Sequence, residues 1–390
     1  MNNKEIIDLD SKYIIQNYGR QPIALSHGEG VIIWDTDGKQ YIDFFAGLAV
    51  NVLGQSHPKV IKTIQKQAEK LIHVSNVYYT EEQVKLAKKL SEISIFDRVF
   101  YANSGAEANE GAIKLARKFT GKGEIISANN SFHGRTLATV TATGQDKYKE
   151  PFKPLPTGFM HVPFGDSKAI SNAINDDTAA ILIEAIQGEG GVVVPPENYL
   201  KEVESICKEN NVILILDEIQ TGFGRIGEMF AYELYGIKPD IITIAKALGN
   251  GYPIGGVLAR GEVATAFDFG DHGTTFGGNA LGCAVAMTVI ETIKEENLLE
   301  NSKTVGEYFK DKLYKLKEKH DFIKDVRGFG LFLALELDQN SSDITDKMLK
   351  KGFLINSTAG NVLRFVPPLI IKKDHVDKLI KALDNLFFEI

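Results

Sequence analysis

The chain has little of several residue types that mark particular protein classes. Its 390 residues include only two cysteines, in unrelated contexts, which excludes a disulfide framework and a cysteine-based metal site. Acidic residues outnumber basic ones by 51 to 44, so no surplus of positive charge is available to neutralise nucleic-acid phosphates. No apolar run approaches the roughly 18 residues that span a membrane, and residues 1–11 lack the apolar core of a signal peptide. We therefore expect a cytoplasmic protein without a nucleic-acid, membrane or metal partner.

Short apolar runs alternate with helical periodicity between residues 98 and 281. The runs are rich in β-branched residues and bounded by turn formers, which is typical of strands buried on both faces of a parallel sheet. This succession predicts an α/β fold with a mainly parallel sheet covered by helices. The expected strands are Arg98–Ala102, Glu124–Ala128, Ala180–Glu184, Val212–Leu216, Ile241–Ile244 and Gly256–Ala259.

The segments on either side of this unit predict a second, smaller domain. We expect a helix over 10–18, a β-meander over 31–43, strands over 330–337 and 362–366, and an amphipathic last helix. The expected division is an N-terminal segment packing with the small domain (1–45), a large domain (46–285) and a C-terminal small domain (286–390).

Two strands of the expected sheet each end in an ionisable residue. Asp217 follows the run Val212–Leu216, and Lys246 comes just after Ile241–Ile244. Ligands of open α/β sheets bind at the carboxyl ends of the strands, so both side chains should face one crevice. A lysine enclosed there forms a Schiff base with a carbonyl, and pyridoxal phosphate (PLP) needs that lysine and an acid against its ring nitrogen. The ordinary alternative is an aspartate that ends a strand and a lysine on a helix surface.

A literal G-x-G-x-x-G also occurs, at Gly222–Gly227. A dinucleotide-binding fingerprint places these glycines directly between a strand and a helix. Here Asp217–Thr221 intervene after the strand and no clear helix begins inside the motif. We interpret it as a flexible loop and disfavour a nicotinamide cofactor.

A strand–helix junction at residues 102–107 is a candidate phosphate site. Ser104 followed by Glu107 is a capping box, and Gly105 lies at the mouth of a helix whose free amides attract anions. An ordinary capped helix has the same pattern.

The segment at residues 132–136 is a second candidate. Phe132 is able to stack on a planar ring, and Arg135 is able to bind a carboxylate. For His133 we expect a structural role.

Three more segments place polar side chains beside glycine or inside apolar sequence. Glu184 and Glu189 flank a glycine-rich turn, where they either pair with cations or cap the turn. The hydroxyls of residues 274 and 275 lie among glycines and are able to reach phosphate oxygens, as in many ordinary loops. Arg364 lies in an apolar strand, which is unusual for an arginine without a partner.

Seven of these segments, in this order, resemble one family, the class III (ω-amino-acid) aminotransferases of PLP fold type I. They are N-S-G-A-E-A-N-E at 103–110, F-H-G-R-T at 132–136, Q-G-E-G-G at 187–191, L-D-E-I-Q-T-G-F-G-R at 216–225, A-K-A-L-G-N-G-Y-P-I-G-G at 245–256, H-G-T-T-F-G-G-N at 272–279 and L-R-F-V-P-P-L at 363–369. The resemblance implies an aspartate aminotransferase-like α/β fold. Its sheet would be mainly parallel, with helices on both faces and a smaller α+β domain beside it.

The resemblance also implies how PLP is held. Lys246 would bind the cofactor covalently and move a proton, and Asp217 would keep the pyridine nitrogen protonated. The other cofactor-binding residues that it implies are Ser104, Gly105, Ala106, Phe132, Gln220 and, from a second subunit, Thr275. The family completes its site across a homodimer interface.

For the substrates, the resemblance implies two arginines that bind carboxylates and a glutamate that neutralises one of them. Arg135 would anchor the carboxylate of the donor, and Arg364 would supply the second cation that 2-oxoglutarate needs. Glu189 would neutralise Arg364 while the donor is bound, and Thr274 would contact substrate from the neighbouring subunit. The histidine of F-H-G-R-T is closer to the acetylornithine branch than to the ornithine branch, which carries tryptophan there.

The implied reaction is transamination of N2-acetyl-L-ornithine with 2-oxoglutarate in arginine biosynthesis. The alternative within the class is another ω-aminotransferase, with succinylornithine, acetyl-lysine, ornithine or 4-aminobutyrate as donor. A racemase or decarboxylase of the same fold would lack a carboxylate anchor, yet both Arg135 and Arg364 are present. A non-catalytic regulator would have lost Lys246 or gained a DNA-binding segment, and neither change is found in the sequence.

Overall fold

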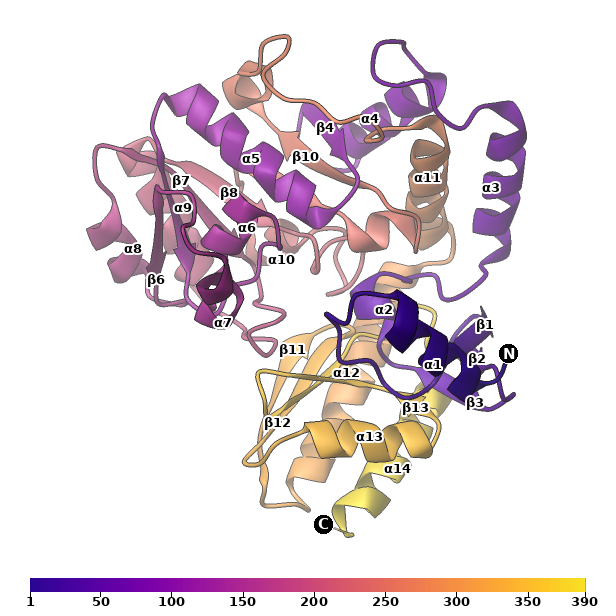
Figure 1. The fold of residues 1–390 in the computed structure, drawn as a ribbon. Helices are drawn as coiled ribbons and strands as arrows, with labels where there is room; N and C mark the ends of the chain where they lie inside the picture. The colour runs from indigo at the N-terminus through magenta and orange to yellow at the C-terminus, as the bar shows by residue number, and fades with distance from the viewer. Residues whose placement is uncertain (390) are drawn as a thin grey trace.

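The computed structural model describes residues 1–389, so the last residue of the expected domain 286–390 lies outside the described residues. Figure 1 shows a large sheet with its helices in the upper part of the molecule and the segments from both ends of the chain together in the lower part. Three sheets of four, seven and four strands make up this arrangement.

The seven-stranded sheet forms the frame of the upper part. Its strands β9, β8, β7, β5 and β6 are parallel neighbours, and β10 runs antiparallel to both β9 and β4. In spatial order the strands are β4 (Arg98–Ala102), β10 (Gly255–Ala259), β9 (Ile241–Ile244), β8 (Ile213–Asp217), β7 (Thr178–Glu184), β5 (Glu124–Ala128) and β6 (Phe159–Val162). The predicted mainly parallel sheet is confirmed.

Alternate residues of these strands pack into two different cores. In β7, Ala180 and Leu182 contact the cluster that includes α5 (Gly105–Thr120), whereas Ile181 and Ile183 join the cluster that includes α9 (Tyr199–Asn210). Successive side chains of a strand point to opposite faces, so helices cover both faces of the sheet, as predicted. This double cover explains why β7, β8 and β9 are buried along their whole length.

The two ends of the chain build the lower part together. One sheet joins β1 (Leu25–Glu29), β2 (Ile32–Asp35) and β3 (Gln40–Asp43) to β13 (Phe353–Leu354), and the other contains β11 (Ile323–Phe329), β12 (Phe332–Leu337), β15 (Val362–Phe365) and β14 (Asn356–Thr358). Three helices accompany them: α12 (Leu298–Lys317), α13 (Ser342–Lys350) and α14 (Lys373–Phe387).

The remaining helices connect and flank these sheets. They are α1 (Asn3–Tyr13), α2 (Ala46–Ala49), α3 (Pro58–Lys70), α4 (Glu81–Glu92), α6 (Leu137–Ala142), α7 (Asp146–Lys149), α8 (Ser167–Ala173), α10 (Ala231–Tyr235), α11 (Ala280–Glu295) and the short 3₁₀ turns Glu150–Phe152, Lys246–Gly249 and Gly261–Thr265. The expected domain boundary at 285/286 falls inside α11, and the division into 1–45, 46–285 and 286–390 stays a prediction.

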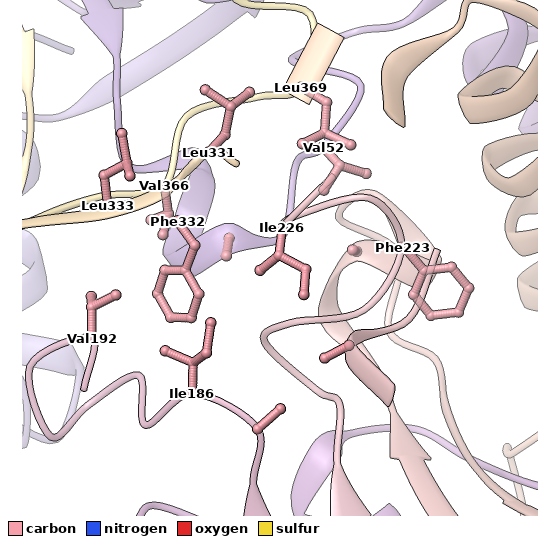
Figure 2. Packing of buried hydrophobic residues seen from close by; sticks show 14 of the residues in the cluster. Val52, Ile186, Val192, Phe223, Ile226, Leu331, Phe332, Leu333, Val366 and Leu369 are labelled. Carbon is pink, nitrogen blue, oxygen red and sulfur yellow. The ribbon is translucent and has the colours of Figure 1, made fainter. Parts of the chain in front are cut away.

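One apolar cluster joins the upper and lower parts. Figure 2 shows side chains from the loops after β7 and β8, among them Ile186 and Ile226, gathered with Phe332 of β12 and with Leu369, which follows β15. These residues are almost fully buried, so the lower part is packed against the carboxyl-end loops of the large sheet. Residues of the two parts are thereby able to face one pocket.

Several predicted elements differ in position from the structure. The first helix covers 3–13 rather than 10–18, because Asn2 and Glu5 form a capping box at its start. Strands β1, β6 and β11 were not predicted, and β6 is a half-exposed edge strand without a continuous apolar run. The loop at Gly222–Gly227 is a loop as predicted, but it is buried rather than free, since Arg225 donates to the carbonyls of Leu331 and Pro367.

Within residues 1–389, the structure contains no helix with both the length and the apolar character needed to cross a membrane.

Candidate active site

A pocket of about 390 Å³ lies at the carboxyl ends of β7, β8 and β9. Its walls also come from the start of α5, the loop after β5 and the turn after β9. Among the predicted site residues, those that line it are Ser104, Gly105, Ala106, Phe132, Arg135, Glu189, Asp217, Gln220 and Lys246. Residues separated by more than 140 positions are therefore brought together, although their individual roles stay predictions.

Asp217 ends β8 at the floor of this pocket and is 5% exposed. Its Oδ2 accepts a hydrogen bond from Asn109 Nδ2 at 2.8 Å and lies 2.8 Å from Nδ1 of the buried His133. Its Oδ1 accepts from the amide of Ile219 at 3.0 Å. These contacts fix the carboxylate in one direction.

His133 therefore orients Asp217, in keeping with the structural role expected for it. Asn109 was missed by the sequence reasoning. The signal for it was a polar residue on the apolar face of a helix, next to Ala108 and Ala112, which are both fully buried.

Lys246 follows β9 at the turn that lines the pocket. Its φ of 43° lies in the left-handed region, which a side chain other than glycine rarely adopts and which is found mainly at functional sites. Removal from water lowers the pKa of its ammonium below the usual 10.5, although the negative charge of Glu189 acts in the opposite direction. The neutral amine is therefore available at lower pH than for a lysine in water.

Glu184 ends β7 and is paired in register with Asp217 on β8. Its two oxygens accept hydrogen bonds from the amides of Phe132 at 3.2 Å and Gly188 at 3.1 Å. Burial raises the pKa of this carboxyl to about 7. One side chain thus ties the loop that carries Phe132 to the loop that carries Glu189.

Arg364 lies on β15 of the lower part and is 1% exposed. Its Nη1 donates to Glu189 Oε1 at 2.7 Å and to Gln220 Oε1 at 3.1 Å. Its Nε and Nη2 both donate to Asn356 Oδ1, at 2.9 and 2.6 Å. Burial acts to raise the pKa of Glu189. The charges of Arg364 and Lys246, together with hydrogen bonds from Arg364 and Gln220, outweigh burial, so the pKa lies below the usual 4.5.

Arg135, in contrast, is exposed and lines the pocket. Within residues 1–389 its guanidinium makes no hydrogen bond or ion pair, so all its N–H donors are free. The guanidinium carbon lies 4.0 Å from the ring centre of Tyr148 and 5.4 Å from that of Phe132. Arg135 is therefore held by aromatic faces and is open to a carboxylate.

The start of α5 supplies free amides to the same pocket. The Ser104 side chain caps the helix by accepting from the amide of Glu107 at 3.2 Å. The amides of Gly105 and Ala106 donate to no protein group among the described residues, and they lie at the positive end of the helix dipole. A Cβ at Gly105 would lie 2.8 Å from Cδ1 of Ile219, so a larger residue would force the Ile219 side chain to move.

Gly188 lies between the two carboxylates of its loop and is packed equally tightly. A Cβ at this position would overlap with the amide group of Gln220, the same group that accepts from Arg364. A larger residue here would therefore force the Gln220 amide to shift away from its present place.

Three predicted residues do not line this pocket in the described chain. Arg364 is joined to the lining residues Glu189 and Gln220 by hydrogen bonds, whereas Thr274 and Thr275 have no such link. Thr274 Oγ1 accepts from Asn103 Nδ2 at 3.0 Å and from the amide of Gly277 at 3.2 Å, and it lines a separate hollow beside Tyr101. Thr275 is exposed. The described chain therefore does not bring these two hydroxyls to its pocket.

Comparison with known proteins places the whole chain among relatives of one kind. The model of the aminotransferase class-III family matches residues 13–387. The acetylornithine aminotransferase of Methanothermobacter thermautotrophicus is 57% identical over 390 residues, covering 100% of both chains. That of Methanocaldococcus jannaschii is 55% identical over 398 residues, again covering 100% of both.

Solved structures agree with these relatives in fold. An ornithine aminotransferase of Toxoplasma gondii, with partial occupancy of PLP at its active site, matches with a TM-score of 0.97 and 34% identity, covering 100% of this chain and 95% of that chain. The acetylornithine aminotransferase of Elizabethkingia anophelis matches with a TM-score of 0.89 and 34% identity, covering 100% of both. Every segment that lines the pocket lies within these matches.

Proposed function

The chain belongs to the class III aminotransferases, a PLP-dependent family, and from this premise we propose that it transfers the δ-amino group of N2-acetyl-L-ornithine to 2-oxoglutarate. The products would be N-acetyl-L-glutamate 5-semialdehyde and L-glutamate, as a step of arginine biosynthesis. The observation that carries the proposal is a pair of arginines at the pocket of Lys246, in a chain with full-length relatives named acetylornithine aminotransferase. Arg135 is open in the lining, and Arg364 is masked by Glu189 and Gln220.

The chemistry of the pocket residues fits PLP. A desolvated lysine, a buried aspartate, an aromatic ring and two free helix amides are the groups that an aldehyde, a pyridine nitrogen, a planar ring and a phosphate require. When bound, PLP supplies an electron sink for the negative charge that develops on the amine-bearing carbon of the substrate. We assign the phosphate to the amides of Gly105 and Ala106, beside Ser104.

The remaining ring contacts follow from the same arrangement. Asp217 Oδ2, fixed by Asn109 and His133, would hold a proton on the ring nitrogen. Phe132 would cover one face of the ring, and Gln220 would reach its hydroxyl group. Because Asn109 and His133 both contact Oδ2, the Asp217 carboxylate is held in one direction.

Lys246 would move the proton that the reaction requires. Its Nζ is neutral at lower pH than that of a free lysine, so it is able to accept the proton from the amine-bearing carbon of the donor. The left-handed backbone at this residue directs the side chain from the end of β9 into the pocket. The same Nζ would later return the proton during the reaction with 2-oxoglutarate.

The two arginines would distinguish the two substrates. Acetylornithine presents its terminal amine to Lys246 and has one carboxylate, at the far end, for Arg135. During that half-reaction Glu189 neutralises Arg364. 2-Oxoglutarate has a second carboxylate beside its carbonyl, and Glu189 would release Arg364 to bind it.

A homodimer would complete the site, with Thr274 and Thr275 serving the partner's pocket. In support, the apolar side chains of Val77, Tyr78 and Phe276 are 78%, 70% and 59% exposed near the same loop. Gln83 and Asn76 link the loop 76–83 to the loop 274–278 through hydrogen bonds. We also propose a cytoplasmic location, in keeping with two buried cysteines that are both free thiols.

A second candidate donor is ornithine, because the Toxoplasma ornithine aminotransferase matches the fold with a TM-score of 0.97. The two donors differ only in the acetyl group on the α-nitrogen. Ornithine would bring a positive charge close to Arg135, whereas acetylornithine would not. The open, unpaired Arg135 favours the uncharged acetylated form.

The visible absorption spectrum of the purified protein with PLP tests these proposals. We expect a yellow band that bleaches with N-acetylornithine and returns with 2-oxoglutarate, and bleaches little with ornithine or 4-aminobutyrate. A band that bleaches best with another amine would keep the aminotransferase activity and change the donor. No band after addition of PLP would contradict the assignment of Lys246.

A further inference from the structure

We propose that Tyr148 is a positioning residue that fixes the plane of the Arg135 guanidinium for the carboxylate of the substrate. The inference rests on the proposed function, because it concerns the residue that recognises the donor. Tyr148 belongs to α7, a short helix that the sequence analysis did not connect with the site.

The geometry around Arg135 is an aromatic clamp formed by Phe132 and Tyr148. The guanidinium carbon lies 4.0 Å from the ring centre of Tyr148, which is contact distance for a stacked pair, and 5.4 Å from the ring centre of Phe132. The two rings meet edge to face, with their centres 5.8 Å apart and their planes at 83°. Tyr148 is therefore the closer partner of Arg135 and also contacts the ring that would cover PLP.

Arg135 needs such a clamp because no other group orients it. The side chain is exposed, and no hydrogen bond or ion pair fixes it within residues 1–389. An exposed arginine loses side-chain entropy when it binds a carboxylate. Stacking occupies the face of the guanidinium and leaves the N–H groups in its plane free for a two-pronged contact with a carboxylate.

The helix that carries Tyr148 is anchored to the segment that carries Phe132. Gln145 Nε2 donates to the carbonyls of Asn130 and Ser131 at 3.3 and 3.1 Å, and the amide of Tyr148 donates to the carbonyl of Gln145 at 3.1 Å. The two sides of the clamp are thus held at a fixed separation. The Tyr148 ring is therefore held in one place, where it fixes the plane of the Arg135 guanidinium.

Lys147 offers a matched control on the same helix. Its Nζ lies 4.8 Å from the centre of the Tyr148 ring, and its side chain is exposed. A positive charge near the donor carboxylate would attract it without any stacking. Lys147→Leu removes this charge and keeps the clamp, which separates the two explanations.

The experiment compares substrates with and without the carboxylate in the PLP-loaded enzyme. N-Acetylputrescine has the amine and the acetamide of N-acetylornithine but no carboxylate, so it gains nothing from Arg135. For Tyr148→Leu we expect kcat/KM for N-acetylornithine to fall by about 5- to 30-fold, mainly through KM, because a stacked cation contributes about 1–2 kcal/mol. The kcat/KM for N-acetylputrescine should change by less than about two-fold on the same reasoning.

Two further variants identify the cause. Tyr148→Phe keeps the ring. It should retain at least half of the preference for N-acetylornithine over N-acetylputrescine that Tyr148→Leu loses. Lys147→Leu should lose none of it. The proposal is overturned if Tyr148→Leu damages both substrates equally, if Tyr148→Phe is as damaging as Tyr148→Leu, or if Lys147→Leu reproduces the loss.

A binding measurement separates this inference from the proposed donor. Glutarate has two carboxylates and no reactive carbonyl, so its dissociation constant reports carboxylate binding alone. It should be about 5- to 30-fold weaker in Tyr148→Leu, in line with the same stacking contribution. Failure of N-acetylornithine as a donor would contradict the proposed function only. An unchanged dissociation constant for glutarate would contradict the role of Tyr148.

Discussion

The two arginines of the candidate site occupy opposite environments. Arg364 lies on a strand of the lower part, is 1% exposed and donates four hydrogen bonds to Glu189, Gln220 and Asn356. Arg135 lies on a loop of the upper part, is exposed and is held by two aromatic faces alone. A buried cation must be paired, whereas an exposed one need not be.

Under the proposed function, this difference would let one site accept two substrates with different numbers of carboxylates. Arg364 would stay masked until a competing carboxylate displaced Glu189. Arg135 has no acid to displace and would be open to either substrate.

The largest effect is expected from the loss of Lys246, the residue on which both proposed half-reactions depend. Lys246→Ala should lower the rates of both half-reactions by at least about 10²- to 10⁴-fold, the usual contribution of a positioned acid–base group. Single-turnover absorbance measurements with each substrate would show it. The circular dichroism spectrum should remain that of the wild type, and a normal rate in this folded variant would refute the role of Lys246.

The next effect should separate the two arginines. Arg364→Ala removes one partner of a buried ion pair, a change that costs about 2–5 kcal/mol in binding. The half-reaction with 2-oxoglutarate should therefore slow by about 30- to 3,000-fold, and that with N-acetylornithine far less. Stopped-flow rates of the two half-reactions provide the measurement. Equal losses in both would remove the distinction between a masked and an open arginine.

Arg135→Ala should have a smaller effect that is shared by both substrates. Loss of a charged hydrogen bond costs about 1.5–3 kcal/mol, so KM for each substrate should rise by about 10- to 150-fold. The melting temperature should stay close to that of the wild type, because Arg135 has no polar partner to leave unpaired. A marked fall in melting temperature would show that Arg135 has a structural role.

The smallest effect concerns acid stability. The folded-state pKa of Glu189 lies below its unfolded value of 4.5, so its ionised form favours the folded state. That stabilisation is present above pH 4.5 and is lost as the pH falls through the folded-state value. In Glu189→Gln, the melting temperature should depend less on pH in this acid range.

Arg135→Ala is the control for this measurement, since Arg135 has no acid partner. It should keep the wild-type profile of melting temperature against pH. A profile for Glu189→Gln that matches the wild type would show that the ion pair with Arg364 contributes nothing to stability.

The sequence predicts the main residues of this site better than it predicts the side chains that hold them in place. Asp217 and Lys246 follow buried β-branched strands, and the carboxyl ends of such strands meet at one edge of a sheet. Arg364 was recognisable because its strand is otherwise apolar. In each case hydrophobic periodicity placed the residue.

The partners of these residues could not be predicted in the same way. Asn356 contacts Arg364 through the register of β14 with β15, and β14 is a three-residue polar strand without an apolar pattern. Tyr148 lies on a four-residue helix that is too short to show periodicity. Such contacts depend on tertiary packing between segments, and local sequence carries little of that information.

The packing of Gly188 has a consequence for inheritance. Every missense change that one base substitution makes in a glycine codon introduces a residue with a Cβ. At this position that atom would displace Gln220, and Gln220 is hydrogen-bonded to Arg364. Every missense allele one base from the present codon would therefore force the Gln220 amide to shift, so an inherited change at Gly188 should alter the surroundings of Arg364.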